Sequence, residues 1–169
     1  EVDHIKPAEL AAWIVEGRSD YRLIDLRTAD EFAAYHIPTA ENAQLTALTE
    51  YPLLRNEKIV LYSEGGIHSA QAWLLLRAQG YEGVYTVLGG LEGWKDEVLF
   101  PVMPADAVPR DRAQFERAAA LAQFFGGQPR TDGAAAAEIL ATQLPKLAAP
   151  AATGPAVPAA PRKKKKEGC

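Results

Sequence analysis

Hydrophobic positions recur at helical spacing near the start of the chain. A short extended piece precedes Pro7, and Leu10, Trp13 and Ile14 then fall on one face of a helix before Gly17. Proline favours the first position of a helix and glycine favours the position just past its end. The pattern therefore predicts a short strand followed by a helix that ends at Gly17.

Apolar runs predict the next strands. Leu23, Ile24 and Leu26 form a short run, "EKIVLYS" at 57–63 contains a continuous run and is the clearest strand, and "VYTVLGG" at 84–90 is a further strand. Strands of a parallel sheet covered on both faces have this composition. A turn at 35–40 leading into one more short buried strand, at about 41–45, completes the set.

Segments with helical character separate these runs. We expect a helix whose first turn holds Asp30 and Glu31, a brief helix over 46–54, a longer one over 69–79, and a last helical turn in 90–98. Strand and helix therefore alternate, which indicates an α/β fold, a parallel sheet flanked by helices.

Beyond Pro104 the pattern changes. A helix is predicted that ends at Gly126 and docks on the domain or on a partner; its apolar face holds Phe115, Ala118, Ala119, Ala122 and Phe125. A second helix is expected over 131–145, before a stretch rich in alanine and proline. We divide the chain into a domain at 1–104, a helical extension at 105–145, and an Ala/Pro-rich linker with a basic tail at 146–169.

Charge is unevenly distributed along the 169 residues. The net charge is −4, but Arg162 to Lys166 contribute five positive charges and Glu167 one negative, which leaves 13 positive and 21 negative residues elsewhere. An acidic body argues against nucleic acid as a partner, and we expect a protein partner to bind through 105–169. A transmembrane helix needs about 18 or more consecutive apolar residues, and no apolar run in the chain is that long. A chain that starts at Glu1 is expected to have been trimmed, which slightly favours an exported or periplasmic protein over a cytoplasmic one.

The candidate chemistry is concentrated between Ser63 and Ser69. The strongest predicted strand ends at Ser63, and the carboxyl ends of parallel strands are where open α/β sheets bind ligands. Gly65 and Gly66 allow tight curvature, so that the backbone N–H groups of Glu64, Gly65, Gly66, Ile67, His68 and Ser69 can converge on an anion. Such a loop lowers the pKa of a thiol and stabilises a persulfide.

Several motifs together resemble the single-domain rhodaneses, the thiosulfate sulfurtransferase-like family. They are "DLR" followed by "EF", "YHIPTAEN", "IVLYSEGGIHSAQA" and "VLGGLEGW", which span roughly residues 3–104. The resemblance implies a rhodanese-like fold, no cofactor, and a six-residue loop that suits a sulfur-containing anion better than phosphate. Asp25, Arg27, Glu31 and His36 are expected to support the structure, the first three through buried hydrogen bonds and ion pairs and not as acids or bases.

Two side chains depart from the family pattern in the loop. Ser63 stands where the resemblance places the cysteine that accepts sulfur, and His68 stands where it places an anion-binding arginine. A hydroxyl cannot hold a transferable sulfur as a persulfide does. Tyr35 and Thr39 replace glycines that flank His36, which is expected to reshape the turn and narrow the pocket.

These observations leave two hypotheses for function. The first is a non-catalytic module with a binding, regulatory or scaffolding role in sulfur or redox metabolism. The second is a sulfurtransferase or sulfur carrier that uses Cys169, the only cysteine, on a mobile tail whose lysines depress the pKa of its thiol; a label or a functionless end explains Cys169 equally well.

Other sites are disfavoured. A hydrolase built from Ser63, His68 and Glu64 lacks a G-x-S-x-G elbow, and residues this close on one tight loop seldom give the required geometry. His4, His36 and His68 lack ligand spacing, so no metal site is expected.

Overall fold

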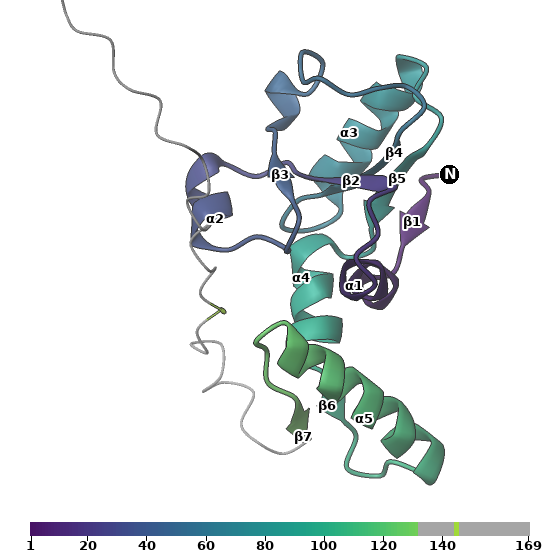
Figure 1. The fold of residues 1–169 in the computed structure, drawn as a ribbon, viewed down its shortest axis with the longest axis vertical. Coiled ribbons are helices and arrows are strands. Elements are labelled where there is room, and N and C mark those ends of the chain that lie inside the picture. Colours follow the sequence, from purple (N-terminus) through teal and green to yellow (C-terminus); the bar gives the residue numbers. More distant parts are fainter. Residues whose placement is uncertain (132–143, 146–169) are drawn as a thin grey trace, which may run out of the picture.

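A five-stranded parallel sheet forms the centre of the computed structural model, which describes residues 1–131 and 144–145 (Figure 1). The strand order is β1-β5-β4-β2-β3, and every neighbouring pair runs parallel. This arrangement confirms the predicted parallel α/β fold. The strands are β1 (His4–Ile5), β2 (Tyr21–Asp25), β3 (Glu41–Asn42), β4 (Lys58–Tyr62) and β5 (Val84–Val87).

The connecting helices lie close to where the pattern predicts them. They are α1 (Pro7–Val15), α2 (Ala29–Ala34), α3 (Ile67–Ala78) and α4 (Gly90–Trp94), which continues into the π-helical turn η2 (Lys95–Leu99). The brief helix expected over 46–54 is wrong in its extent, because only the 3₁₀ turn η1 (Leu45–Ala47) forms. Pro52 lacks an N–H and disfavours helical backbone at the residue before it, which opposes a continuation to residue 54.

Successive side chains of the central strands point to opposite faces of the sheet and belong to two separate hydrophobic cores. Leu23, Val60 and Val87 belong to a core that also contains residues of α1 and α4. Ile24, Ile59, Leu61 and Val84 belong to the other core, with Ala72 and Leu76 of α3. Figure 1 shows α1 and α4 on the side of the sheet opposite to α3. Burial on both faces explains why these strands read as continuous apolar runs.

The segment after the sheet packs on the domain. In α5 (Pro109–Phe124) and just after it, Ala122 and Phe125 are buried, and the Phe125 ring meets Trp94 edge-on with 5.0 Å between centroids. The N–H of Gln128 donates to the carbonyl of Leu99. The expected docking of this helix is thus on the domain.

Two short strands close this extension. β6 (Val102–Met103) pairs parallel with β7 (Arg130–Thr131), on either side of the predicted domain boundary at 104. The division into three parts stays a prediction. The second predicted helix lies almost wholly outside the described residues, as do the linker, the basic tail and Cys169. In the part that is described, every helix is too short or too polar to cross a bilayer.

The turn before β3 contains a strained residue, which gives a first prediction. Thr39 has a φ of +76°, a left-handed conformation that a β-branched residue rarely adopts. Thr39→Gly is expected to stabilise the fold by about 1 kcal/mol, measured as a higher urea midpoint. Thr39→Ala serves as the control, because it removes the same hydroxyl contact to Tyr21 (3.2 Å) without the freedom of glycine. Equal midpoints for the two variants would contradict the strain.

Candidate functional site

A pocket opens at the carboxyl ends of β2 and β4. The two strands pair with Asp25 opposite Tyr62, so the residues that follow them lie side by side at the edge of the sheet. The pocket has a volume of about 230 Å³ and is lined by Leu26, Arg27, Thr28, Glu31, Gln44, Ser63, Glu64 and His68. The structure therefore brings Arg27, Glu31, Ser63, Glu64 and His68 to one site, at the edge of the sheet where a crevice was expected from the strand that ends at Ser63.

The carbonyl groups of the loop after β4 are all engaged. The N–H groups of Leu91 and Glu92, in the first turn of α4, donate to the carbonyls of Ser63 (2.9 Å) and Glu64 (3.1 Å). The carbonyls of Gly65 and Gly66 accept from the hydroxyls of Ser63 (2.8 Å) and Ser69 (3.0 Å). Four consecutive carbonyl oxygens are thus fixed by neighbouring donors.

The N–H groups of the same loop are left without partners. Among the described residues, no protein acceptor bonds the backbone N–H groups of residues 64–69. Since α3 begins at Ile67, several of these donors are also the unpaired N–H groups of a helix start. Unpaired donors at the positive end of a helix favour a negatively charged ligand.

Ser63 is built into the loop and does not form a nucleophile–base pair. Its side chain is almost fully buried, and its hydroxyl donates to the carbonyl of Gly65 two residues on. His68 is exposed at the pocket wall, and no hydrogen bond joins it to Ser63 in the described residues. The geometry gives no support to a hydrolase.

A buried ion pair holds one wall of the pocket. The Arg27 guanidinium donates to both oxygens of Asp25, from Nε at 3.0 Å and from Nη2 at 2.6 Å, and Nη2 also reaches the carbonyl of Tyr35. Burial opposes the charge of Arg27, but the hydrogen bonds and charge of Asp25 prevail, and the pKa of Arg27 is raised. Burial, then Asp25, also raises the pKa of Tyr62, which accepts from the N–H of Ile37.

A second group of charges meets at Glu64. Its carboxylate lies 3.5 Å from Nη1 of Arg27 and 3.1 Å from Nζ of Lys95, which also bonds Glu92 at 2.9 Å. Burial alone would lower the pKa of Lys95, but the bonds to Glu92 and Glu64 raise it. Glu64 thus links the loop to both nearby cations.

Glu31 and His36, two of the residues predicted to support the structure, make local contacts in and after α2. Glu31 is exposed and forms a capping box with Thr28, whose hydroxyl and N–H lower the pKa of Glu31. His36 stacks on Phe32 with 3.8 Å between ring centroids, and its Nδ1 lies 2.8 Å from the Phe32 carbonyl. That these residues support the fold stays a prediction.

The expected narrowing of the pocket by Tyr35 and Thr39 is wrong. Neither side chain lines the pocket. The Tyr35 ring is buried in the core, where its hydroxyl accepts from Nε1 of Trp94 at 3.0 Å, and burial raises its pKa to about 12. Thr39 is exposed on the turn before β3 and keeps a positive φ.

Several residues in or next to the pocket were not predicted as site residues. Lys95 and Gly90 come from the segment after β5, and Gln44 follows β3. Gly90 lies in the motif "VLGGLEGW", which signals a turn into a helix but not a contact with a loop 25 residues earlier. Such contacts arise only when the sheet brings the segments together.

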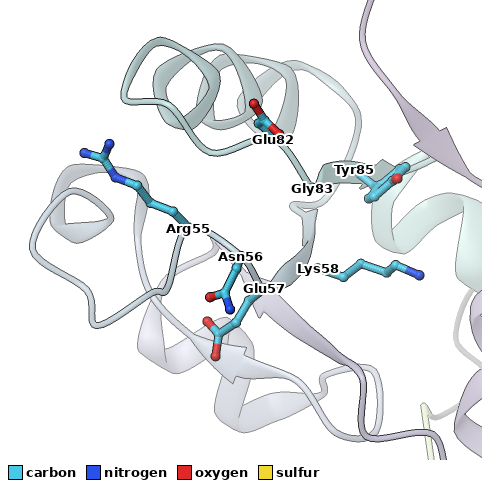
Figure 2. A pocket seen from close by; sticks show the side chains of 7 residues that line it. All are labelled: Arg55, Asn56, Glu57, Lys58, Glu82, Gly83 and Tyr85. Atoms are coloured by element: carbon cyan, nitrogen blue, oxygen red, sulfur yellow. The ribbon is translucent and has the colours of Figure 1, made fainter.

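Two further pockets offer less chemistry. One, of about 310 Å³, lies at the opposite edge of the sheet, before β4 and β5. Figure 2 shows that its Arg55 and Lys58 point in opposite directions, so the two cations do not converge on a shared ligand. The other, of about 280 Å³, is a mostly apolar hollow between β6 and α5. Within residues 1–131 and 144–145, no cluster of three His, Cys, Asp or Glu side chains is placed to hold a metal ion.

Comparison with known proteins bears on this site. A family model described as "Rhodanese-like domain" matches residues 6–97. The thiosulfate sulfurtransferase GlpE of Coxiella burnetii is 30% identical over 90 residues, which cover 52% of this chain and 84% of that protein. The uncharacterized protein YqhL of Bacillus subtilis is 33% identical over 88 residues, 49% of this chain and 70% of that protein. A crystal structure of a rhodanese-like domain protein from Staphylococcus aureus aligns with a TM-score of 0.51 at 28% identity, covering 57% of this chain and 94% of that one.

Proposed function

Because this chain belongs to the rhodanese-like domain family, which includes sulfurtransferases, we propose that it is a non-catalytic member whose loop binds a small sulfur-containing anion without accepting its sulfur. The observation that carries the proposal is the hydroxyl of Ser63. The resemblance places a sulfur-accepting cysteine at this position, and the hydroxyl here bonds the loop's own Gly65 carbonyl. An alcohol has too high a pKa to act as a thiolate does.

The surroundings of Ser63 support binding in the absence of turnover. The unpaired N–H groups of residues 64–69 and the start of α3 remain available to an anion. The helix-capping and ion-pair contacts around the pocket do not depend on a thiol. We infer a binding, regulatory or scaffolding role in sulfur or redox metabolism, exercised through this loop and through a protein partner that contacts 105–169.

Sulfur transfer to cyanide from thiosulfate tests this proposal. We expect the Cys169→Ser chain, which contains no cysteine, to show no turnover above background. Adding Ser63→Cys to that chain is expected to restore a persulfide: the introduced thiolate attacks the outer sulfur of thiosulfate, the S–S bond breaks, and sulfite leaves. Mass spectrometry would detect the gain of about 32 Da, one sulfur atom.

The outcomes separate the two hypotheses for function. Turnover by the Cys169→Ser chain, with Ser63 in place, would overturn the non-catalytic proposal. Turnover by the natural chain that disappears in Cys169→Ser would instead identify Cys169 as the sulfur carrier. A persulfide only in the chain with Ser63→Cys supports the proposal, because it shows that the loop still receives the sulfur anion and lacks only the atom that holds it.

A further inference from the structure

Glu64 binds both cationic side chains next to the loop. Its two carboxylate oxygens divide between them, with Oε2 lying 3.5 Å from Arg27 and Oε1 lying 3.1 Å from Lys95. The arrangement is notable because Glu64 is itself a loop residue, and its backbone carbonyl is anchored to α4. A carboxylate of the protein thus occupies the positions at which the oxygens of a bound oxyanion would meet positive charge.

Both cations already have protein partners. Arg27 gives hydrogen bonds from Nε and Nη2 to Asp25 and to the carbonyl of Tyr35, which leaves Nη1 beside Glu64, and Lys95 bonds both Glu64 and Glu92. His68 stands where the resemblance implies an arginine, so the pocket lacks the guanidinium of that side chain. Apart from Nη1 of Arg27, which faces Glu64, the donors that remain at the loop are the uncharged N–H groups of residues 64–69.

The side chains that line the pocket carry more negative than positive charge. Arg27 is the one full positive charge among the residues lining it, against the carboxylates of Glu31 and Glu64. Backbone donors and a helix start attract an anion, whereas the carboxylates repel it in proportion to its charge. A singly charged ligand therefore experiences half of the repulsion that a doubly charged one does.

We propose that Glu64 is a specificity-determining residue that weakens the binding of doubly charged anions, such as thiosulfate, relative to that of singly charged ones, such as a persulfide or hydrosulfide anion. This inference rests on the proposed anion-binding function of the loop. It names the class of ligand: a small sulfur monoanion. The loop would then differ from a thiosulfate-binding site in its charge, in addition to the difference made by the serine at position 63.

Titration of the full chain with two probe anions tests the inference. The probes are thiosulfate, a dianion, and thiocyanate, a monoanion, and the readout is the NMR shift of the loop amides from Glu64 to Ser69. A carboxylate about 6 Å from the anion, at an effective dielectric constant of about 40, changes affinity about tenfold for each charge on the anion. Glu64→Gln is therefore expected to tighten thiosulfate binding about 100-fold and thiocyanate binding about tenfold.

Glu92→Gln is the matched control. Glu92 bonds the same lysine, and its replacement removes the same charge, but its side chain neither lines the pocket nor contacts Arg27. Both affinities are expected to change less than about threefold, because Glu92 lies outside the pocket and its charge acts on a bound anion across screening solvent. Unchanged amide spectra away from the loop would verify that both variants fold.

The result distinguishes the two levels of inference. If Glu64→Gln leaves the ratio of the two affinities as it is in the natural chain, or if Glu92→Gln shifts it equally, the role of Glu64 is wrong while anion binding by the loop stands. If neither anion shifts a loop amide in any of the three proteins, the anion-binding function itself is overturned.

Discussion

Asp25→Ala is expected to destabilise the fold by about 3–5 kcal/mol, the cost of leaving a buried charge without its partner. Asp25 is fully buried and Arg27 nearly so, and the carboxylate accepts from Nε, Nη2 and the backbone N–H of Arg27. Urea unfolding followed by tryptophan fluorescence would measure the loss. The variant should also weaken anion binding by the loop, because Arg27 forms one wall of the pocket.

The chain contains an exposed counterpart of this pair. Asp20 accepts from Arg18 through Nε at 2.9 Å and Nη2 at 2.6 Å, and the two residues are likewise two positions apart. The Asp20 side chain is 57% exposed, compared with 0% for Asp25. Because water replaces the lost partner at an exposed site, Asp20→Ala is expected to leave the urea midpoint unchanged within error.

The comparison isolates burial, since the two pairs have nearly the same geometry. Similar losses in both variants would mean that the hydrogen bonds themselves, and not desolvation, stabilise the Asp25–Arg27 pair. A small loss in both would mean that water enters the pocket and solvates Arg27 when Asp25 is removed. The first result would contradict burial as the source of the effect, and the second would contradict the assignment of Asp25 and Arg27 as structural support for the loop.

Most of the sheet could be predicted from the sequence because each longer strand contains its own run of apolar residues. Residues 59–62 form a continuous apolar run within the central strand β4, and Pro7 and Gly17 bound α1 closely. The brief helix at 46–54 failed because its signal was weak and Pro52 interrupts it. Docking on the domain was one of two expectations for α5, since an apolar helix face does not specify what covers it.

The position of the pocket could be predicted from the ends of the strands, whereas the ion pairs around it could not. Arg27 and Ser63 each follow a predicted parallel strand, so their proximity could be expected. The ion pairs of Glu64 could not, because Lys95 reaches the loop only through the packing of α4 against it. Residues 31 positions apart carry no local signal of such a contact.

The glycines show most clearly that contacts between distant segments cannot be predicted from local sequence. Gly65 and Gly66 were expected to provide the curvature of the loop, but neither has a positive φ, and an added Cβ would meet nothing within 4 Å at either position. Gly90, in the first turn of α4, has a φ of +60°, and an added Cβ would lie 2.5 Å from the Gly65 carbonyl oxygen and 2.6 Å from that of Ser63. The glycine that the loop requires is therefore outside the loop.

Gly90→Ala is accordingly expected to cost about 2–5 kcal/mol, by adding the penalty of a left-handed backbone to that of overpacking against main-chain atoms. Either the loop or α4 must move, and the bonds from Leu91 to Ser63 and from Glu92 to Glu64 would lengthen. We expect the loop amides to shift and anion binding to be lost. Gly65→Ala is the control within the loop, with an expected cost below about 0.5 kcal/mol and anion binding retained. A larger loss of stability and binding in Gly65→Ala than in Gly90→Ala would show that the loop curves through its own glycines and does not depend on α4.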